Sequence, residues 1–366
     1  MSQRDLEITR DVYQRHPVLV RHGTRSSALG KLSDARAWPV SYATMFHMTN
    51  DSAAFLNATA LRENGFEPAP LGRWRKGHLE ALPLYEGKMV QAFDHRAADV
   101  VLHAANLHRA AQPEGIAAAA KRDPARCPTP QYWLLDARLP ETVSHVVAFK
   151  DVTSPTNMRS MIAAVLPRAG CANTLALLMP EAQLSAKETA RLNAIVVGTL
   201  NSMAFDFVAR QKIQGQHLNW FIVEQLPVIP PARFDDPLPA TFAKHMRADG
   251  LMNGHHAAPT IADFVVPQVL ALSYTAHDLA PFARDLGYVD EQGQVLPPFI
   301  WDDEDRRCRL AALDALFFWL YGLGQDDAAY VLDTFPIVRQ QDEAAFGRFR
   351  TSEDVLALLP LLPLFN

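Results

Sequence analysis

Cysteine is scarce in this chain, with Cys127, Cys171 and Cys308 as the only three among 366 residues. They lie far apart and are odd in number, so neither a disulfide framework nor a Cys-x-x-Cys metal site is indicated. Apolar runs of the roughly 18 to 20 residues that span a bilayer are missing. The opening sequence, MSQRDLEITRDVYQRHP, is charged throughout and has no apolar signal core. We therefore expect a cytoplasmic protein without a membrane partner.

Common catalytic motifs are also missing. There is no Walker A sequence, no His-Glu-x-x-His and no Gly-x-Ser-x-Gly. Two prolines before an aromatic residue occur in Leu296-Pro-Pro-Phe299. Adenine methylation needs Asn, Asp or Ser in the first position of such a loop, to bind the amino group of an extruded base, and a leucine cannot do this. Gly322-Leu-Gly324 lies at a predicted helix end, not in a turn suited to S-adenosylmethionine. We identify no catalytic or cofactor-binding residue.

Acidic and histidine residues do not predict a metal site either. Asp302-Asp-Glu-Asp305 is typical of a solvated first helical turn. His255 and His256 are adjacent, so their side chains point in different directions on a helix or a strand. We expect no metal ligands in the chain.

Charge is distributed unevenly along the sequence. Residues 1–232 hold 25 Lys and Arg against 20 Asp and Glu, a balance of +5, and residues 233–366 hold 10 against 20, a balance of −10. The first part is therefore the one suited to face phosphates, whereas the second would be repelled by them. Chance asymmetry between two domains is the alternative explanation.

The break between these parts falls in the proline-rich stretch 226–239, which can continue neither a helix nor a central strand. Before it, apolar runs of strand length occur at residues 145–150, 161–166, 174–179 and 220–223. Composition and helical spacing predict helices over residues 101–120, 186–210, 258–274, 303–321 and 325–333. The fold class predicted is α+β: a mixed-sheet domain over 1–232 followed by a mainly helical domain over 233–366.

Four polar segments before the break have side chains suited to holding DNA. Residues 71–79 contain Arg73, Arg75 and Lys76 around Trp74, which combines positive charge with a stacking surface. In residues 83–96, three apolar side chains spaced by four are expected to pack inward. The polar side chains of Lys88, Gln91, His95 and Arg96 would then remain to reach DNA.

The other two segments are polar and contain donors and acceptors that can contact base edges or phosphates. Residues 151–159 contain Asn157 and Arg159, and residues 210–219 contain Arg210, Lys212, Gln214, His217 and Asn219, with a glycine that allows close backbone approach. Such loops are common on any protein surface, so each of them alone is weak evidence for DNA binding.

Several strings together resemble the C-terminal half of large adenine-specific DNA methyltransferases and fused type IIG restriction–methylation enzymes. The most specific is LYEGKMVQAFDHR at 84–96. Others follow in the family's order: FHMTNDS at 46–52, SPTNMRSMIAAVLP at 154–167, LNSMAFDFVARQK at 200–212, EQLPVIPP at 224–231, LDALFFWLYGL at 313–323 and YVLDTFPIV at 330–338.

This resemblance implies a target-recognition domain that binds double-stranded DNA beside a methyltransferase catalytic domain or subunit, in restriction–modification or phage defence. S-adenosylmethionine is expected only in that partner or missing domain. The residues expected to face DNA are Asn157, Arg159, Arg210, Lys212, Gln214, His217 and Asn219, with Arg73 and Arg75 added from their loop. For Lys88 and Arg96, structural pairs with Glu86 and Asp94 are the alternative. Alternatives for the whole chain are a structural subunit of a defence complex, a nuclease, or a methyltransferase with an unrecognised site.

Overall fold

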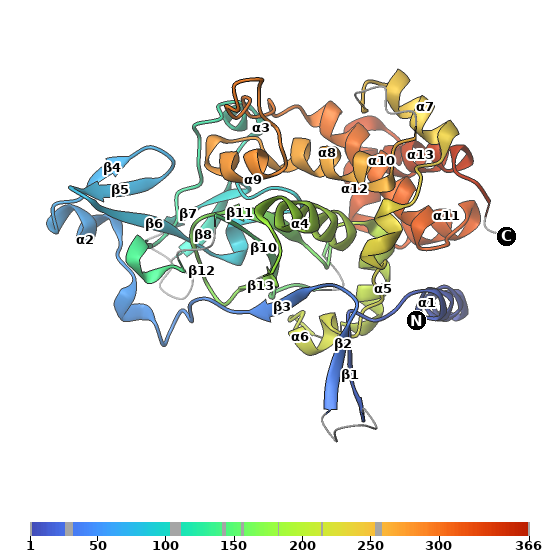
Figure 1. Ribbon diagram of the computed structural model, residues 1–366, viewed down its shortest axis with the longest axis horizontal. Coiled ribbons are helices and arrows are strands. Elements are labelled where there is room, and N and C mark those ends of the chain that lie inside the picture. Colours follow the sequence, from blue (N-terminus) through green and yellow to red (C-terminus); the bar gives the residue numbers. More distant parts are fainter. Residues whose placement is uncertain are drawn as a thin grey trace.

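A computed structural model describes residues 2–25, 32–102, 111–140, 144–154, 157–181, 183–213, 215–252 and 258–364. The fold is α+β, with sheets in the first part of the chain and helices in the last (Figure 1). No single helix within these ranges combines the length and hydrophobicity needed to cross a bilayer.

The central sheet has four antiparallel strands in the order β11, β10, β13, β3. Their bounds are β3 Val40–Ala43, β10 His145–Lys150, β11 Ala163–Pro167 and β13 Leu175–Pro180. Residues 145–149 and 175–178 are buried, because one sheet face packs on α4 and the other on the segments around Tyr85 and Val90. The strands predicted near 145–150, 161–166 and 174–179 are therefore confirmed.

A second, smaller sheet extends from the molecule as a lobe (Figure 1). It comprises β4 Glu67–Ala69, β5 Arg73–Lys76, β6 Leu79–Tyr85, β9 Trp133–Leu135 and β12 Gly170–Cys171. Leu71 and Gly72, with φ of 63° and 70°, make the turn between β4 and β5. Helix α2 (Ala58–Glu63) packs on this sheet through Leu61, beside Trp74 and Trp133.

Two hairpins complete the strands: β1 Val20–Arg25 with β2 Leu32–Arg36, and β7 Ala98–Leu102 with β8 Ala111–Gly115. The first projects away from the body of the molecule (Figure 1). The second corrects the helix predicted over 101–120: alanine favours helix, but cross-strand pairing of 98–102 with 111–115 prevails over that local preference. Among the described residues, the only helix in the region predicted as helical over 101–120 is α3, at Ala118–Lys121.

The helix predicted over 186–210 is two helices, α4 Ala186–Leu200 and α5 Met203–Lys212, bent by 65°. Asn201 fixes the bend from the interior. Its Oδ1 accepts from the Ala163 amide at 2.9 Å, and its Nδ2 donates to the Ala163 carbonyl at 2.8 Å. Ser202 caps α5 by accepting from the Phe205 amide at 3.2 Å.

The remaining helices are α1 Gln3–Arg15, α6 Trp220–Val223, α7 Ala240–Ala248, α8 Ile261–Ser273, α9 Ala280–Asp285, α10 Asp303–Leu320, α11 Gln325–Asp333, α12 Pro336–Phe346 and α13 Arg350–Leu358. Helix α10 begins where the acidic run predicts, since Asp302 caps it by accepting from the Asp305 amide at 2.8 Å. Gly322, with φ of 76°, follows its end. Residues 220–223, predicted as a strand, form α6 instead.

The core continues from the sheet into the C-terminal helices. Helix α4 packs on the sheet with one side and on α8 with the other, and α8 packs on α10. One cluster therefore contains Val147 of the sheet together with Phe264 and Phe317 of these helices. The proposed boundary at residue 232 falls beside the buried Phe234, within this shared core.

Candidate nucleic-acid interface

Arg96, predicted to contact DNA, is completely buried. Its guanidinium donates to the carbonyls of Lys121, Asp123, Arg126 and Thr275 and to the Thr275 hydroxyl, at 2.8–3.0 Å. A side chain enclosed by five acceptors does not reach a phosphate, so the prediction for Arg96 is corrected to a structural role. The expected pairing with Asp94 takes another form, in which Asp94 Oδ1 accepts from the Arg96 backbone amide at 2.9 Å.

The neighbouring polar residues of this segment are buried as well. Asp94 Oδ2 lies 2.5 Å from Lys121 Nζ, and His95 Nε2 lies 3.0 Å from Asp278 Oδ1. Burial alone would raise the pKa of Asp278, but His95 and Arg96 beside it hold that pKa below its ordinary value. The Asp-His-Arg string thus joins the loop before β7 to α3 and to the turn after α8.

Arg159 and Arg210 form a second buried arrangement around Asp206 of α5. Their side chains are 12% and 9% exposed, and they approach Asp206 Oδ2 at 3.2 and 3.5 Å. Arg210 also donates to the carbonyls of Asn157 and Met158 and lies 4.1 Å from the centre of the Phe335 ring. We correct both assignments: these arginines hold the 157–161 turn against α5. Asn157 itself is exposed, and its DNA contact stays a prediction.

Arg73, Arg75 and Lys88 reach the surface but have acidic partners. Arg73 Nη1 lies 3.4 Å from Glu80 and Arg75 Nε lies 3.1 Å from it, while Lys88 Nζ lies 3.0 Å from Glu86. The Arg75 hydrogen bond is the main cause that lowers the Glu80 pKa. Trp74 between the arginines is buried against Trp133, which corrects its expected stacking role. Two arginines thus share one carboxylate, and Lys88 has a carboxylate of its own.

Residues 212–213 and 215–219 behave differently, because buried neighbours hold their backbone while most of their polar side chains remain outside. Leu218 is completely buried and Ile213 is buried as well, which anchors the segment at both ends. Between them, residues 216–218 run antiparallel to 151–153, with hydrogen bonds from the Thr153 amide to the Gln216 carbonyl at 2.9 Å and from the Leu218 amide to the Asp151 carbonyl at 2.7 Å. Lys212, His217 and Asn219 are exposed. Gln214 lies outside the described residues.

A groove of about 420 Å³ opens beside this segment. Its lining is Lys212, Gly215, Gln216, His217, Asn219, Phe221, Ile222 and Gln225. Three of the predicted DNA-facing residues therefore share one concave surface, which we call the 212–225 groove. The sequence predicted DNA contacts within residues 212–219, but it did not predict that residues of α6 line the same groove.

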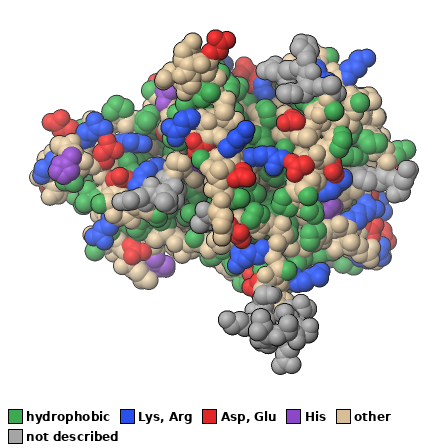
Figure 2. Space-filling view, viewed as in Figure 1, with side chains coloured by type: hydrophobic (Ala, Val, Ile, Leu, Met, Phe, Trp, Pro, Cys, Tyr) green, Lys and Arg blue, Asp and Glu red, His purple; other side chains and the backbone are tan. Residues whose placement is uncertain are grey.

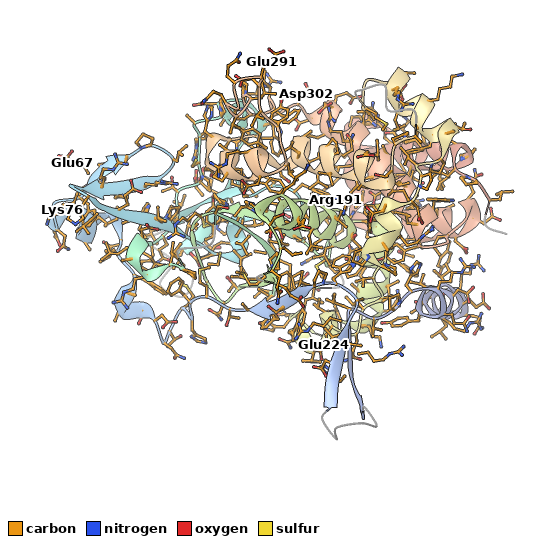
Figure 3. All side chains as sticks on the ribbon, viewed as in Figure 1. Glu67, Lys76, Arg191, Glu224, Glu291 and Asp302 are labelled. Atoms are coloured by element: carbon orange, nitrogen blue, oxygen red, sulfur yellow. The ribbon has the colours of Figure 1, made fainter. Side chains whose placement is uncertain are left out.

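Helix α6, which lines the groove, lies next to the start of the projecting hairpin. The amides of Leu19 and Val20 donate to the carbonyls of Leu226 and Glu224 at 2.9 and 2.8 Å, so β1 starts beside the end of α6. In Figure 3, Glu224 lies at the base of the β1–β2 hairpin. This hairpin was not predicted, because its strands are polar and lack an alternating apolar pattern.

Histidines are the partners of acidic residues near the groove. His22 Nε2 lies 2.8 Å from Glu224 and its Nδ1 lies 3.2 Å from Asp34, and hydrogen bonding to Glu224 is the main cause that raises the His22 pKa. His217 Nδ1 lies 3.0 Å from Asp151. On the face seen in Figure 2, Lys and Arg side chains alternate with Asp and Glu.

Another pocket, of about 370 Å³, lies where the 91–93 and 158–159 segments meet α5 and α10. Asp314 of α10 is buried in its wall, with Oδ1 accepting from the Met203 amide at 2.7 Å. Burial raises the pKa of Asp314 to about 6, against the opposing effect of Arg159. Shifted carboxyls occur at active sites and at structural positions alike. Here the hydrogen bond to the first residue of α5 gives Asp314 a capping role.

Within the described ranges, no three His, Cys, Asp or Glu side chains are grouped as metal ligands would be. Leu296-Pro-Pro-Phe299 is engaged in packing: Phe299 stacks on Tyr288 with ring centres 5.0 Å apart. Comparisons of the chain with protein-family models and with curated proteins find no match.

Proposed function

We propose that this chain is a DNA-recognition module of an adenine-specific (N6) DNA methyltransferase, acting in restriction–modification or phage defence. A catalytic domain or partner subunit would bind S-adenosylmethionine and transfer the methyl group. The observation that supports DNA binding best is the 212–225 groove, where Lys212, His217 and Asn219 are exposed and residues 216–218 are hydrogen-bonded to residues 151–153. The methyltransferase connection rests on the strings at 46–52, 84–96, 154–167, 200–212, 224–231, 313–323 and 330–338.

Each of these side chains has a chemical role suited to a duplex. A lysine ammonium is a compact charge for a phosphate, and an asparagine amide can donate and accept at the edge of adenine. Asp151 engages Nδ1 of His217, so Nε2 is the ring nitrogen that a ligand can reach. Asn219 starts α6 without a capping hydrogen bond from its side chain, which leaves its amide for such a contact.

The β1–β2 hairpin supports the same placement of DNA. A two-stranded ribbon has dimensions that fit the major groove. Arg21 and His22 are exposed near the base of this ribbon, next to α6. A duplex held by the 212–225 groove would therefore meet the hairpin as well.

The test is equilibrium binding of the full chain to duplexes selected from a random library, measured by fluorescence anisotropy between 50 and 200 mM salt. Lys212→Ala should weaken binding to all duplexes and reduce the slope of log affinity against log salt by about one unit. Lys244→Ala is the matched control, because Lys244 is exposed on α7 at the opposite side of the molecule from α6 (Figure 1). This control should bind as the unmodified chain does.

Equal behaviour of the two variants would remove the groove from the proposal. Absence of any DNA affinity, together with stable capture of a defence-complex subunit, would favour the structural-subunit alternative. DNA degradation by the purified chain with magnesium would favour a nuclease, and binding of S-adenosylmethionine to the isolated chain would favour a complete methyltransferase.

A further inference from the structure

Phe221 is an aromatic side chain held outward on a rigid base. It is 58% exposed, although α6 is a single helical turn whose Val223 is completely buried. Leu226 after the helix is also buried, and its carbonyl accepts from Leu19. Outward placement of Phe221 therefore follows from the anchoring of its neighbours.

Ile222 lines the groove together with Phe221, and further apolar side chains lie on the adjoining segments. Trp220 stacks on Tyr42, with ring centres 5.0 Å apart and 24° between planes, and Tyr42 is 37% exposed. Val152 is exposed and pairs with His217 across the 151–153 and 216–218 segments. A single exposed hydrophobic residue is ordinary, but an apolar patch with a polar rim marks an interaction surface.

The rim indicates the partner. Lys212, His217 and Asn219 share the groove with Phe221, so a cation and polar donors border the exposed ring. Proteins that open a duplex combine charged backbone contacts with an apolar side chain inserted between bases. Base faces are also the surfaces on which aromatic rings stack with little regard to sequence.

We propose that Phe221 inserts at a base step of the bound duplex and stacks on an unstacked base, while Lys212 holds the adjacent phosphate. This inference rests on the proposed DNA binding and adds local distortion of the duplex to it. A hydrophobic contact with a partner protein is the competing use of the same ring, and the experiment distinguishes the two.

The experiment uses the full chain and library-selected duplexes that carry 2-aminopurine at successive positions. Binding should raise 2-aminopurine fluorescence at one step, where stacking is lost. Phe221→Ala should abolish the rise and weaken affinity by about 5- to 150-fold, the range for loss of one stacked base. Phe221→Trp should retain both. Phe346→Ala is the control, because Phe346 is similarly exposed on α12, away from α6 (Figure 1).

Two results would overturn the insertion of Phe221 and leave DNA binding intact. One is a bound duplex without any change in 2-aminopurine fluorescence, and the other is an unchanged rise in fluorescence with Phe221→Ala. The second result combined with lost partner capture would assign Phe221 to a protein interface. No affinity for DNA in the unmodified chain would overturn the proposed function and this inference together. Circular dichroism of Phe221→Ala would check that the variant is folded.

Discussion

Arginines that look alike in the sequence have opposite environments in the structure. Arg96 is enclosed by carbonyls, and one of its partners, Thr275, is 179 positions away. Arg75 lies on a strand, and its side chain is 59% exposed. Charge and local spacing could not separate the two, because burial of Arg96 depends on a long-range neighbour. The same holds for Arg159 and Asp206, which are joined by the fold.

This contrast predicts a large difference in stability. Arg96→Ala should lower the free energy of unfolding by about 3–5 kcal/mol, since it leaves buried acceptors without a donor beside Asp94 and Asp278. Arg75→Ala, which breaks an exposed pair with Glu80, should change it by about 0–1 kcal/mol. Urea unfolding of both variants measures the difference. Equal losses would show that Arg96 does not have the structural role assigned to it.

Secondary structure was predictable where periodicity and end residues agree. The strand predicted over 145–150 and the helix predicted over 325–333 match the structure at both ends, and the helix predicted over 303–321 begins at its acidic cap and ends at Leu320. The prediction of a strand at 220–223 was wrong, because an apolar run of four residues fits a strand and a helical turn equally well. The bend between α4 and α5 was not predicted, because it depends on tertiary hydrogen bonds of Asn201 with Ala163.

The junction of α5 and α10 yields a pH prediction. A carboxyl with a raised folded-state pKa binds its proton more tightly in the folded chain than in the unfolded chain. Asp314 should therefore reduce stability progressively as pH rises from about 4, its ordinary value, to about 6, the folded value. Asp314→Asn keeps an acceptor for the Met203 amide and carries no charge, so it should be more stable than the unmodified chain above pH 6, by at most about 3 kcal/mol.

Denaturant unfolding of both proteins at pH values from 4 to 7.5 tests this prediction. Subtracting the two curves removes the effects of other titrating groups. The difference should grow between pH 4 and 6 and then stay constant. A difference that does not change over this interval would mean that burial does not penalise the Asp314 carboxylate.

At the scale of the whole molecule, the β1–β2 hairpin projects beyond the body, whereas the groove adjoins the body, because α5, which ends at Lys212, packs on α10 and α11. Residues 233–366 carry 10 basic against 20 acidic side chains, and the β1–β2 hairpin projects away from the helices that this part forms (Figure 1). The asymmetry was visible in the sequence, but the concave surface was not, because residues 151–153, 212–225 and 17–22 meet only in the fold.

Photocrosslinking tests most directly whether DNA occupies this surface. The photoreactive residue p-benzoylphenylalanine would replace Asn219 in the groove, Arg21 on the hairpin or Lys244 on α7, each of them exposed. The account predicts crosslinks to bound duplex from positions 219 and 21 and none from position 244. Crosslinks from position 244 alone, or bound DNA that crosslinks at neither 219 nor 21, would contradict it.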